Sequence, residues 1–149
     1  MNHRQCFPFV VEDDDDFALL VRRAFLKAGV PNGNVRRYRN GEGALADLVS
    51  VDVIRPSVLL LDMELPGMTG LSVLERVRAC ERLANLPAFV LSGRDDGHMV
   101  AAAQALGARG YWMKPHGPGE LLPIVRGMLG SLNGDGDAML PGNLLDGRC

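Results

Sequence analysis

Cysteine, aromatic residues and long hydrophobic runs are all scarce in this sequence of 149 residues. The three cysteines, Cys6, Cys80 and Cys149, lie far apart without Cys-x-x-Cys spacing, which argues against a disulfide framework and against a cysteine-based metal site. No apolar run approaches the ~20 residues that a membrane helix needs, and the N-terminus turns acidic at Glu12, unlike a signal peptide. We therefore expect a cytoplasmic protein that makes no contact with a membrane.

A strong charge of either sign is also missing. Lys and Arg total 16 against 18 Asp and Glu, which gives a net charge of -2. This balance argues against a protein that binds nucleic acid directly. The length and the 47% of hydrophobic residues suit one domain with a buried core. We predict that residues 1–130 form this domain and that residues 131–149 form a tail, either flexible or packed against a partner.

Short apolar segments predict the strands of a parallel sheet. Four segments are apolar throughout rather than alternating, which is typical of strands covered on both faces. A fifth segment is much more polar and suits an edge strand. The four apolar segments are Phe7–Val11, Ser57–Leu61, Ala88–Leu91 and Gly110–Met113, and the polar one is Val35–Tyr38. Pro8 is compatible with this assignment only near the start of its strand.

Helical spacing of apolar residues fills the stretches between these strands. The predicted helices are Asp16–Ala28, Gly43–Val49, Leu71–Cys80, His98–Leu106 and Pro118–Leu129. In the last of them, Pro123 must lie in the first turn or bend the helix. A strand followed by a helix, repeated five times, predicts an α/β fold with a doubly wound parallel sheet and helices on both faces.

Polar residues stand where the predicted strands end. The first strand is followed by the acidic run Glu12–Asp16, the third by Asp62, the fourth by Ser92 and the fifth by Lys114-Pro115. In open α/β sheets, ligands bind beyond the carboxyl ends of the strands. We therefore expect acids, a hydroxyl and an ammonium group to meet at one edge of the sheet.

This combination of groups is suited to binding a phosphoryl group. Three carboxylates at one point repel each other unless a cation joins them, and Mg²⁺ prefers a few carboxylates together with phosphate oxygens. An aspartate beside Mg²⁺ is a competent nucleophile for phosphoryl transfer. The transferred oxygens would then meet the metal, the Lys114 ammonium and the Ser92 hydroxyl.

Each of these features has a simpler explanation when it is taken alone. Asp14–Asp16 can cap a helix, Ser92-Gly93 can be an ordinary turn, and Lys114-Pro115 can be a solvated lysine before a turn proline. Their occurrence together at four strand ends favours a common site.

The motifs resemble those of the receiver domains of two-component response regulators. The matching pieces follow the family's order and cover roughly residues 6 to 130: Val10–Asp13, Leu59–Gly70, Phe89–Gly93 and Gly107–Pro115. The resemblance implies a flavodoxin-like fold with five parallel strands in the order 2-1-3-4-5.

The resemblance also implies a role for each residue of the acidic edge. Asp62 would be the phosphoacceptor and Lys114 its partner. Glu12, Asp13 and Asp62 would hold Mg²⁺, together with the backbone carbonyl of Glu64.

Further residues would form the switch and the surroundings of the phosphoacceptor. Ser92 would turn toward the phosphoryl group, and the rotamer of Tyr111 would follow it. Met63, Arg94 and Pro115 would flank the site, and the bond before Pro115 is expected to be cis.

Three other features concern the surroundings of the site and the chain's departures from its relatives. We consider two readings of Glu64 and Arg94: they pair across the site and slow dephosphorylation, or they are solvated side chains whose pairing matters little. His116 stands where many relatives have Phe, and we expect a plain surface residue there. Trp112 is large for its strand position.

The implied function is that of a single-domain response regulator. The segment Glu12–Phe25 looks most like stand-alone receivers of the phytochrome-associated type, which implies a histidine kinase or phosphotransfer protein as donor, a downstream protein target and a possible homodimer. No turnover of an external substrate is expected. One alternative is a pseudo-receiver that binds partners without phosphorylation. The other is a phosphatase of the haloacid dehalogenase type, but that family needs an aspartate where this chain has Glu64.

Overall fold

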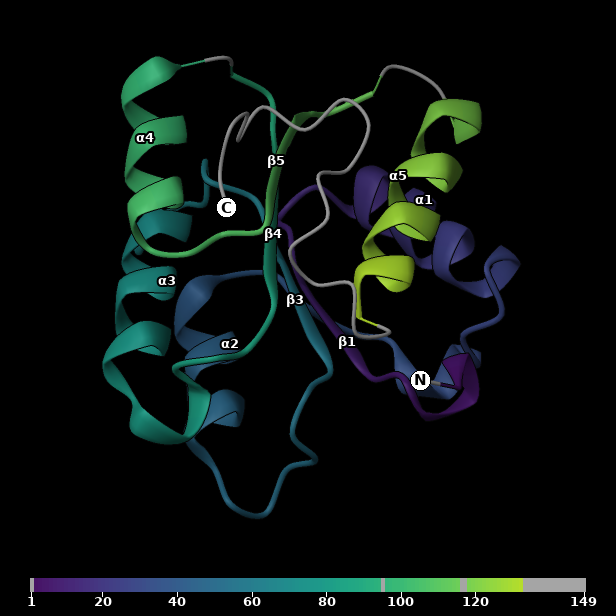
Figure 1. The fold of residues 1–149 in the computed structure, drawn as a ribbon, viewed down its shortest axis with the longest axis horizontal. Coiled ribbons are helices and arrows are strands. Elements are labelled where there is room, and N and C mark those ends of the chain that lie inside the picture. Colours follow the sequence, from purple (N-terminus) through teal and green to yellow (C-terminus); the bar gives the residue numbers. More distant parts are fainter. Residues whose placement is uncertain (1, 95, 116–117, 133–149) are drawn as a thin grey trace.

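A five-stranded parallel sheet forms the middle layer of the protein, and helices cover both of its faces (Figure 1). The computed structural model describes residues 2–94, 96–115 and 118–132. The strands are β1 (Pro8–Val11), β2 (Arg36–Tyr38), β3 (Val58–Leu61), β4 (Ala88–Ser92) and β5 (Gly110–Met113). Their order is β2-β1-β3-β4-β5, so the predicted flavodoxin-like topology and the polar edge strand are both confirmed.

The helices divide between the two faces of the sheet, as Figure 1 shows. One face carries α1 (Asp15–Lys27) and α5 (Pro118–Ser131), and the other carries α2 (Gly41–Val49), α3 (Gly70–Ala79) and α4 (Gly97–Ala105). Three short 3₁₀ helices complete the elements: η1 (His3–Gln5), η2 (Asn32–Asn34) and η3 (Glu81–Leu83). Within the described part of the chain, no helix has the length and apolarity needed to cross a membrane.

Alternation along the strands builds two separate cores. Leu59 and Leu61 of β3 pack toward α2, α3 and α4, whereas Val58 and Leu60 pack toward α1 and α5. Because both faces of β1 and β3 are buried, these two strands consist entirely of apolar residues. This composition makes them recognisable in the sequence as short apolar runs.

Side-chain caps begin the helices that follow the site. Asp14 caps α1 by accepting hydrogen bonds from the backbone N–H groups of Asp16 and Phe17. The capping explanation for part of the acidic run is therefore correct for Asp14. Asn40, Thr69 and Asp96 cap α2, α3 and α4 in the same manner.

The prolines fall close to their expected places. Pro8 is the first residue of β1, the position where a strand best tolerates proline. Pro123 lies inside α5, beyond its first turn, so the first of the two alternatives for this proline is not met. Of the predicted tail at 131–149, residues 133–149 lie outside the described residues, and so does His116.

Trp112 fits its strand because the residue two positions before it is glycine. A Cβ atom on Gly110 would overlap the indole ring of Trp112. The ring stacks on Phe89 with centroids 5.9 Å apart, and Trp112 belongs to the core beneath α1 and α5. The large side chain therefore replaces packing volume that Gly110 does not supply.

Candidate functional site

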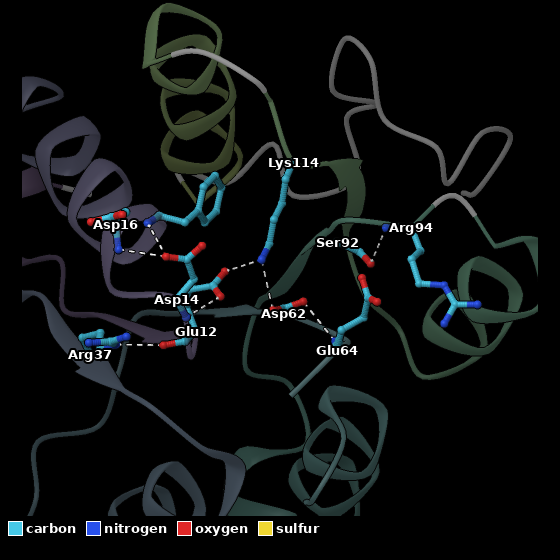
Figure 2. Close-up of polar contacts among 10 residues, drawn as sticks. Glu12, Asp14, Asp16, Arg37, Asp62, Glu64, Ser92, Arg94 and Lys114 are labelled. Atoms are coloured by element: carbon cyan, nitrogen blue, oxygen red, sulfur yellow. Dashed lines mark hydrogen bonds and ion pairs between the residues drawn. The ribbon is translucent and has the colours of Figure 1, made fainter. Parts of the chain in front are cut away.

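Among the predicted site residues, Glu12, Asp62, Ser92 and Lys114 meet at the carboxyl edge of the sheet (Figure 2). Val11 and Leu61 are register partners on β1 and β3, so the residues that follow them, Glu12 and Asp62, lie side by side. Carboxylate oxygens of Glu12, Asp13 and Asp62 all lie within 4.8 Å of one another. Glu12 and Asp62 are buried, whereas Asp13 is exposed. The strand ends thus bring together the three acids that the sequence singled out.

Lys114 lies between the two buried acids. Its Nζ is 2.8 Å from Oε1 of Glu12 and 3.1 Å from Oδ2 of Asp62. Burial alone would lower the pKa of Lys114, but the hydrogen bonds and negative charges of Glu12 and Asp62 outweigh it, so the pKa is raised above its ordinary value. The lysine is therefore held as a cation beside Asp62.

The acidic cluster carries more negative charge than Lys114 can offset. Burial raises the pKa of Glu12 to about 7, the hydrogen bond from Lys114 opposes this, and the charge of Asp62 adds to it. The ionised form of Glu12 is therefore disfavoured mainly by its removal from water, and the negative charge of Asp62 adds to this. Oxygen ligands with excess negative charge, one of them open to solvent, fit the requirements of Mg²⁺ or a similar hard cation.

Backbone contacts fix the carboxylate of Asp62. The backbone N–H of Asp62 donates to the carbonyl of Val11 at 3.0 Å, and Oδ1 of Asp62 accepts from the N–H of Glu64 at 3.0 Å. Gly70 at the start of α3 touches this segment so closely that a Cβ there would overlap the carbonyl oxygen of Asp62. Met63, predicted to flank the site, is buried in the core on the α2–α4 side.

The predicted switch residues are connected through one backbone segment. The Ser92 hydroxyl accepts a hydrogen bond from the N–H of Arg94 at 3.2 Å, and the Tyr111 hydroxyl donates to the carbonyl of Arg94 at 3.4 Å. Both side chains are fully buried. The segment after β4 is therefore held at the same residue by both predicted switch groups.

Of the two readings of Glu64 and Arg94, the ion pair across the site is not formed. Arg94 Nη2 instead lies 4.0 Å from Oδ2 of Asp96, two residues further along the same loop. No ion pair of the described residues joins Glu64 to Arg94, and the Glu64 carboxylate lies over Gly93. Both side chains are exposed, and exposed charges gain little from pairing across a gap.

The expectation of a cis bond before Pro115 is also wrong. Residues 2–94, 96–115 and 118–132 contain no cis peptide bond. The Lys114 N–H still donates to the carbonyl of Ser92 at 2.8 Å, so sheet-like pairing continues past the end of β5. The lysine side chain reaches its partners from this trans backbone. Pro115 lines an open groove of about 600 Å³ between α1 and α5, together with Phe17, Lys114 and Glu120.

Two residues at the site were not identified from the sequence. Lys114 Nζ lies 4.9 Å from the centroid of the Phe17 ring, a cation–π arrangement. Arg37 on β2 donates from Nε to the main-chain oxygen of Glu12 at 2.8 Å. The available signals were the aromatic residue in the first turn after the acids and the arginines of a polar strand next to β1.

Comparisons with known proteins agree with this geometry. Residues 9–126 match the response regulator receiver domain family. The DNA-binding response regulator MtrA of Mycolicibacterium smegmatis is 33% identical over 120 residues, which are 80% of this chain and 49% of that protein. The DNA-binding transcriptional regulator NtrC of Salmonella typhimurium is 32% identical over 117 residues, 78% of this chain and 23% of that protein. The chain thus spans about half or less of the length of these relatives.

Solved structures share the whole fold. The phosphorylated cyanobacterial phytochrome response regulator RcpA is 28% identical with a TM-score of 0.78, over 91% of this chain and 98% of that one. The Mn²⁺-bound response regulator Rcp1 is 25% identical with a TM-score of 0.72, over 91% and 99% of the two chains. The predicted resemblance to phytochrome-associated response regulators is therefore confirmed by the similarity to RcpA.

Proposed function

This chain belongs to the response regulator receiver domain family, and on that premise we propose that it accepts a phosphoryl group on Asp62 from a histidine kinase or a phosphotransfer protein. The observation that carries the proposal is the position of the buried Asp62 carboxylate, which lies 3.1 Å from the Lys114 ammonium and within 4.8 Å of the acids Glu12 and Asp13. A nucleophile, a cationic partner and a set of oxygen ligands are the parts that phosphoryl transfer needs.

The transfer is a displacement at phosphorus. An oxygen of the Asp62 carboxylate attacks the phosphorus of a phosphohistidine, the P–N bond breaks, and its electron pair stays on the imidazole, which takes up a proton. The product is an acyl phosphate on Asp62. Lys114, the Ser92 hydroxyl and the Glu64 N–H then supply donors for the transferred oxygens. Attack by water on phosphorus later restores the carboxylate and releases inorganic phosphate.

The acids would hold Mg²⁺ at this edge. Glu12, Asp13 and Asp62 supply carboxylate oxygens, and the carbonyl of Glu64 is the further ligand that membership of the family implies. When bound, Mg²⁺ offsets the negative charge that the phosphoryl oxygens add to the cluster. The Mn²⁺-bound form of the similar Rcp1 supports a divalent cation here.

The output would be a change of surface read by another protein. A phosphoryl group on Asp62 competes for the Ser92 hydroxyl, which now accepts from Arg94. Release of Arg94 removes a constraint on the segment before α4, and Tyr111, bonded to the same residue, follows. DNA binding is a property of MtrA and NtrC, which this chain matches over only part of their lengths. We place the signalling in the cytoplasm, consistent with the free thiols of Cys6 and Cys80.

Intact mass spectrometry tests the proposal. The chain is incubated with acetyl phosphate or phosphoramidate, with Mg²⁺ or with EDTA. We expect a gain of one phosphoryl group that requires Mg²⁺ and disappears in Asp62→Asn. Asp52→Asn is the matched control, because Asp52 is an exposed aspartate outside the cluster. A wild-type chain that gains no phosphoryl group would favour the pseudo-receiver. Continuous turnover of a simple phosphate ester would favour the phosphatase.

A further inference from the structure

Arg37 connects the edge strand β2 to the acidic end of β1. Its Nε donates to the main-chain oxygen of Glu12 at 2.8 Å, and its Nη1 lies 2.8 Å from Oδ1 of Asp15 in the first turn of α1 (Figure 2 shows the contact with Glu12). The side chain is only 19% exposed. One guanidinium therefore spans the residues on both sides of Asp13.

The peptide group between Glu12 and Asp13 is fixed by this contact. The oxygen that Arg37 binds belongs to the planar unit that carries the N–H of Asp13. The preceding N–H, that of Glu12, donates to the carbonyl of Tyr38 at 2.9 Å. Because β2 holds Glu12 from both its N–H and its carbonyl, the backbone directions of Glu12 and Asp13 are set from the edge strand.

Electrostatics alone would oppose an arginine at this place. A guanidinium near the acids repels a divalent cation and weakens its binding. The Nη2 atom of Arg37 is buried without a hydrogen-bond partner among the described residues, so the position does not satisfy the side chain fully. The contribution of Arg37 to the acidic edge is therefore the orientation that its hydrogen bond gives to the backbone of Glu12 and Asp13.

We propose that Arg37 is a positioning residue for the cation site, orienting the Glu12–Asp13 peptide so that both carboxylates face Asp62. The inference rests on the cation-binding part of the proposed function, because the site it serves is the proposed metal site. Arg39 provides a matched comparison. It lies 2.9 Å from the same Oδ1 of Asp15 but is 64% exposed, and among the described residues its side chain forms no hydrogen bond or ion pair with Glu12.

Binding of Mn²⁺ to the full chain, followed by electron paramagnetic resonance without any phosphodonor, tests the proposal. We expect Arg37→Gln to raise the Kd for Mn²⁺ about 10-fold, the usual effect of losing a residue that orients a metal ligand. Arg39→Gln should leave it nearly unchanged. A role of charge alone predicts the opposite sign for Arg37→Gln, so an equal or tighter Kd overturns the proposal.

Arg37→Lys separates geometry from charge and covers the case in which Arg37→Gln does not fold. It keeps the charge but cannot bind Glu12 and Asp15 as a fork, so we expect weaker Mn²⁺ binding here too, with thermal unfolding of the metal-free protein close to wild type. A wild-type Kd in Arg37→Lys overturns the proposal if Arg37→Gln is unfolded.

Phosphorylation kinetics give a second measurement. The half-saturating Mg²⁺ concentration of Arg37→Gln should rise, while the rate at saturating Mg²⁺ stays near wild type. A lower saturated rate with an unchanged Mn²⁺ Kd overturns the proposal. A wild-type chain that binds Mn²⁺ but accepts no phosphoryl group contradicts the proposed function and leaves the inference on Arg37 standing, whereas a wild-type chain that binds no Mn²⁺ overturns the inference itself.

Discussion

The Nζ atom of Lys114 lies 2.8 Å from Oε1 of Glu12, and this contact joins the ends of β5 and β1, which are separated in the sheet by β3 and β4. The same Nζ atom also lies 3.1 Å from Oδ2 of Asp62. The carboxyl edge is therefore closed across four strands by a single ammonium group. A phosphoryl group on Asp62 would compete with Glu12 for that ammonium.

Removing the ammonium should make stability depend on Mg²⁺. In Lys114→Met, two buried carboxylates lose their hydrogen-bonding cation, and we expect a loss of about 1–3 kcal/mol in the free energy of unfolding without metal. Added Mg²⁺ should stabilise the variant more than it stabilises wild type. Urea denaturation with and without Mg²⁺ measures both effects. Lys27→Met, an exposed lysine at the end of α1, is the control. An equal Mg²⁺ effect in Lys114→Met and wild type would contradict the prediction.

The Phe17 ring should matter for the reactivity of Asp62 through Lys114. The ring centroid lies 4.9 Å from Nζ, and a cation–π contact of this kind contributes about 0.5–2 kcal/mol. Phe17→Leu keeps an apolar side chain but removes the π face, so we expect phosphorylation by acetyl phosphate to slow several-fold. Phe17→Tyr keeps the face and should retain most of the rate. Equal rates in Phe17→Leu and Phe17→Tyr would show that the ring does not hold the lysine.

Gly70 should tolerate no side chain. Its Cβ would overlap the carbonyl oxygen of Asp62 and lie 2.9 Å from the Cα of Met63, and both neighbours are backbone atoms that cannot rotate away. We expect Gly70→Ala to cost about 1–3 kcal/mol in urea denaturation and to slow phosphorylation. Gly130→Ala in α5 meets open space and should be stabilising by up to about 1 kcal/mol. Equal stabilities of the two variants would be inconsistent with this packing.

Tyr38 should ionise at unusually high pH. Burial, and the hydrogen bond that its hydroxyl donates to Oδ2 of Asp47 at 2.7 Å, raise the pKa of Tyr38 to about 12. Because the folded-state pKa is raised above 10, this contribution to stability is complete below pH 10 and is lost as the pH rises through 12. Ultraviolet absorbance of the phenolate follows the titration, with Tyr38→Phe to identify it. Asp47→Asn should lower the pKa, and an unchanged value would assign the shift to burial alone.

The fold and most of the acidic edge could be predicted because both depend on local patterns. Apolar strands covered on both faces stand out in the chain, and Asp62, Ser92 and Lys114 each occupy a strand end. The sheet rule then brings those ends together without any knowledge of side-chain conformations. The ends of the predicted helices and strands lie within two residues of the observed ends, because the apolar patterns that define them are local.

Apart from the bond before Pro115, which is trans rather than cis, the differences and omissions concern how far individual side chains reach. The contact of Arg37 with Glu12 joins residues on different strands, and no spacing in the chain indicates it. One of the two readings of Arg94 had it cross the site toward Glu64, but Asp96 is nearer along its own loop. Whether a long side chain turns toward one acid or another depends on local packing, which a residue pattern does not contain.

The contact between Gly110 and Trp112 couples the substitutions that these two positions can accept during evolution. A mutation of Gly110 to any larger residue drives the indole out of its place, and a smaller residue at 112 would leave a void above the glycine. Each change is harmful by itself and tolerable only when the other accompanies it. Descendants of this chain should therefore keep both residues or exchange both.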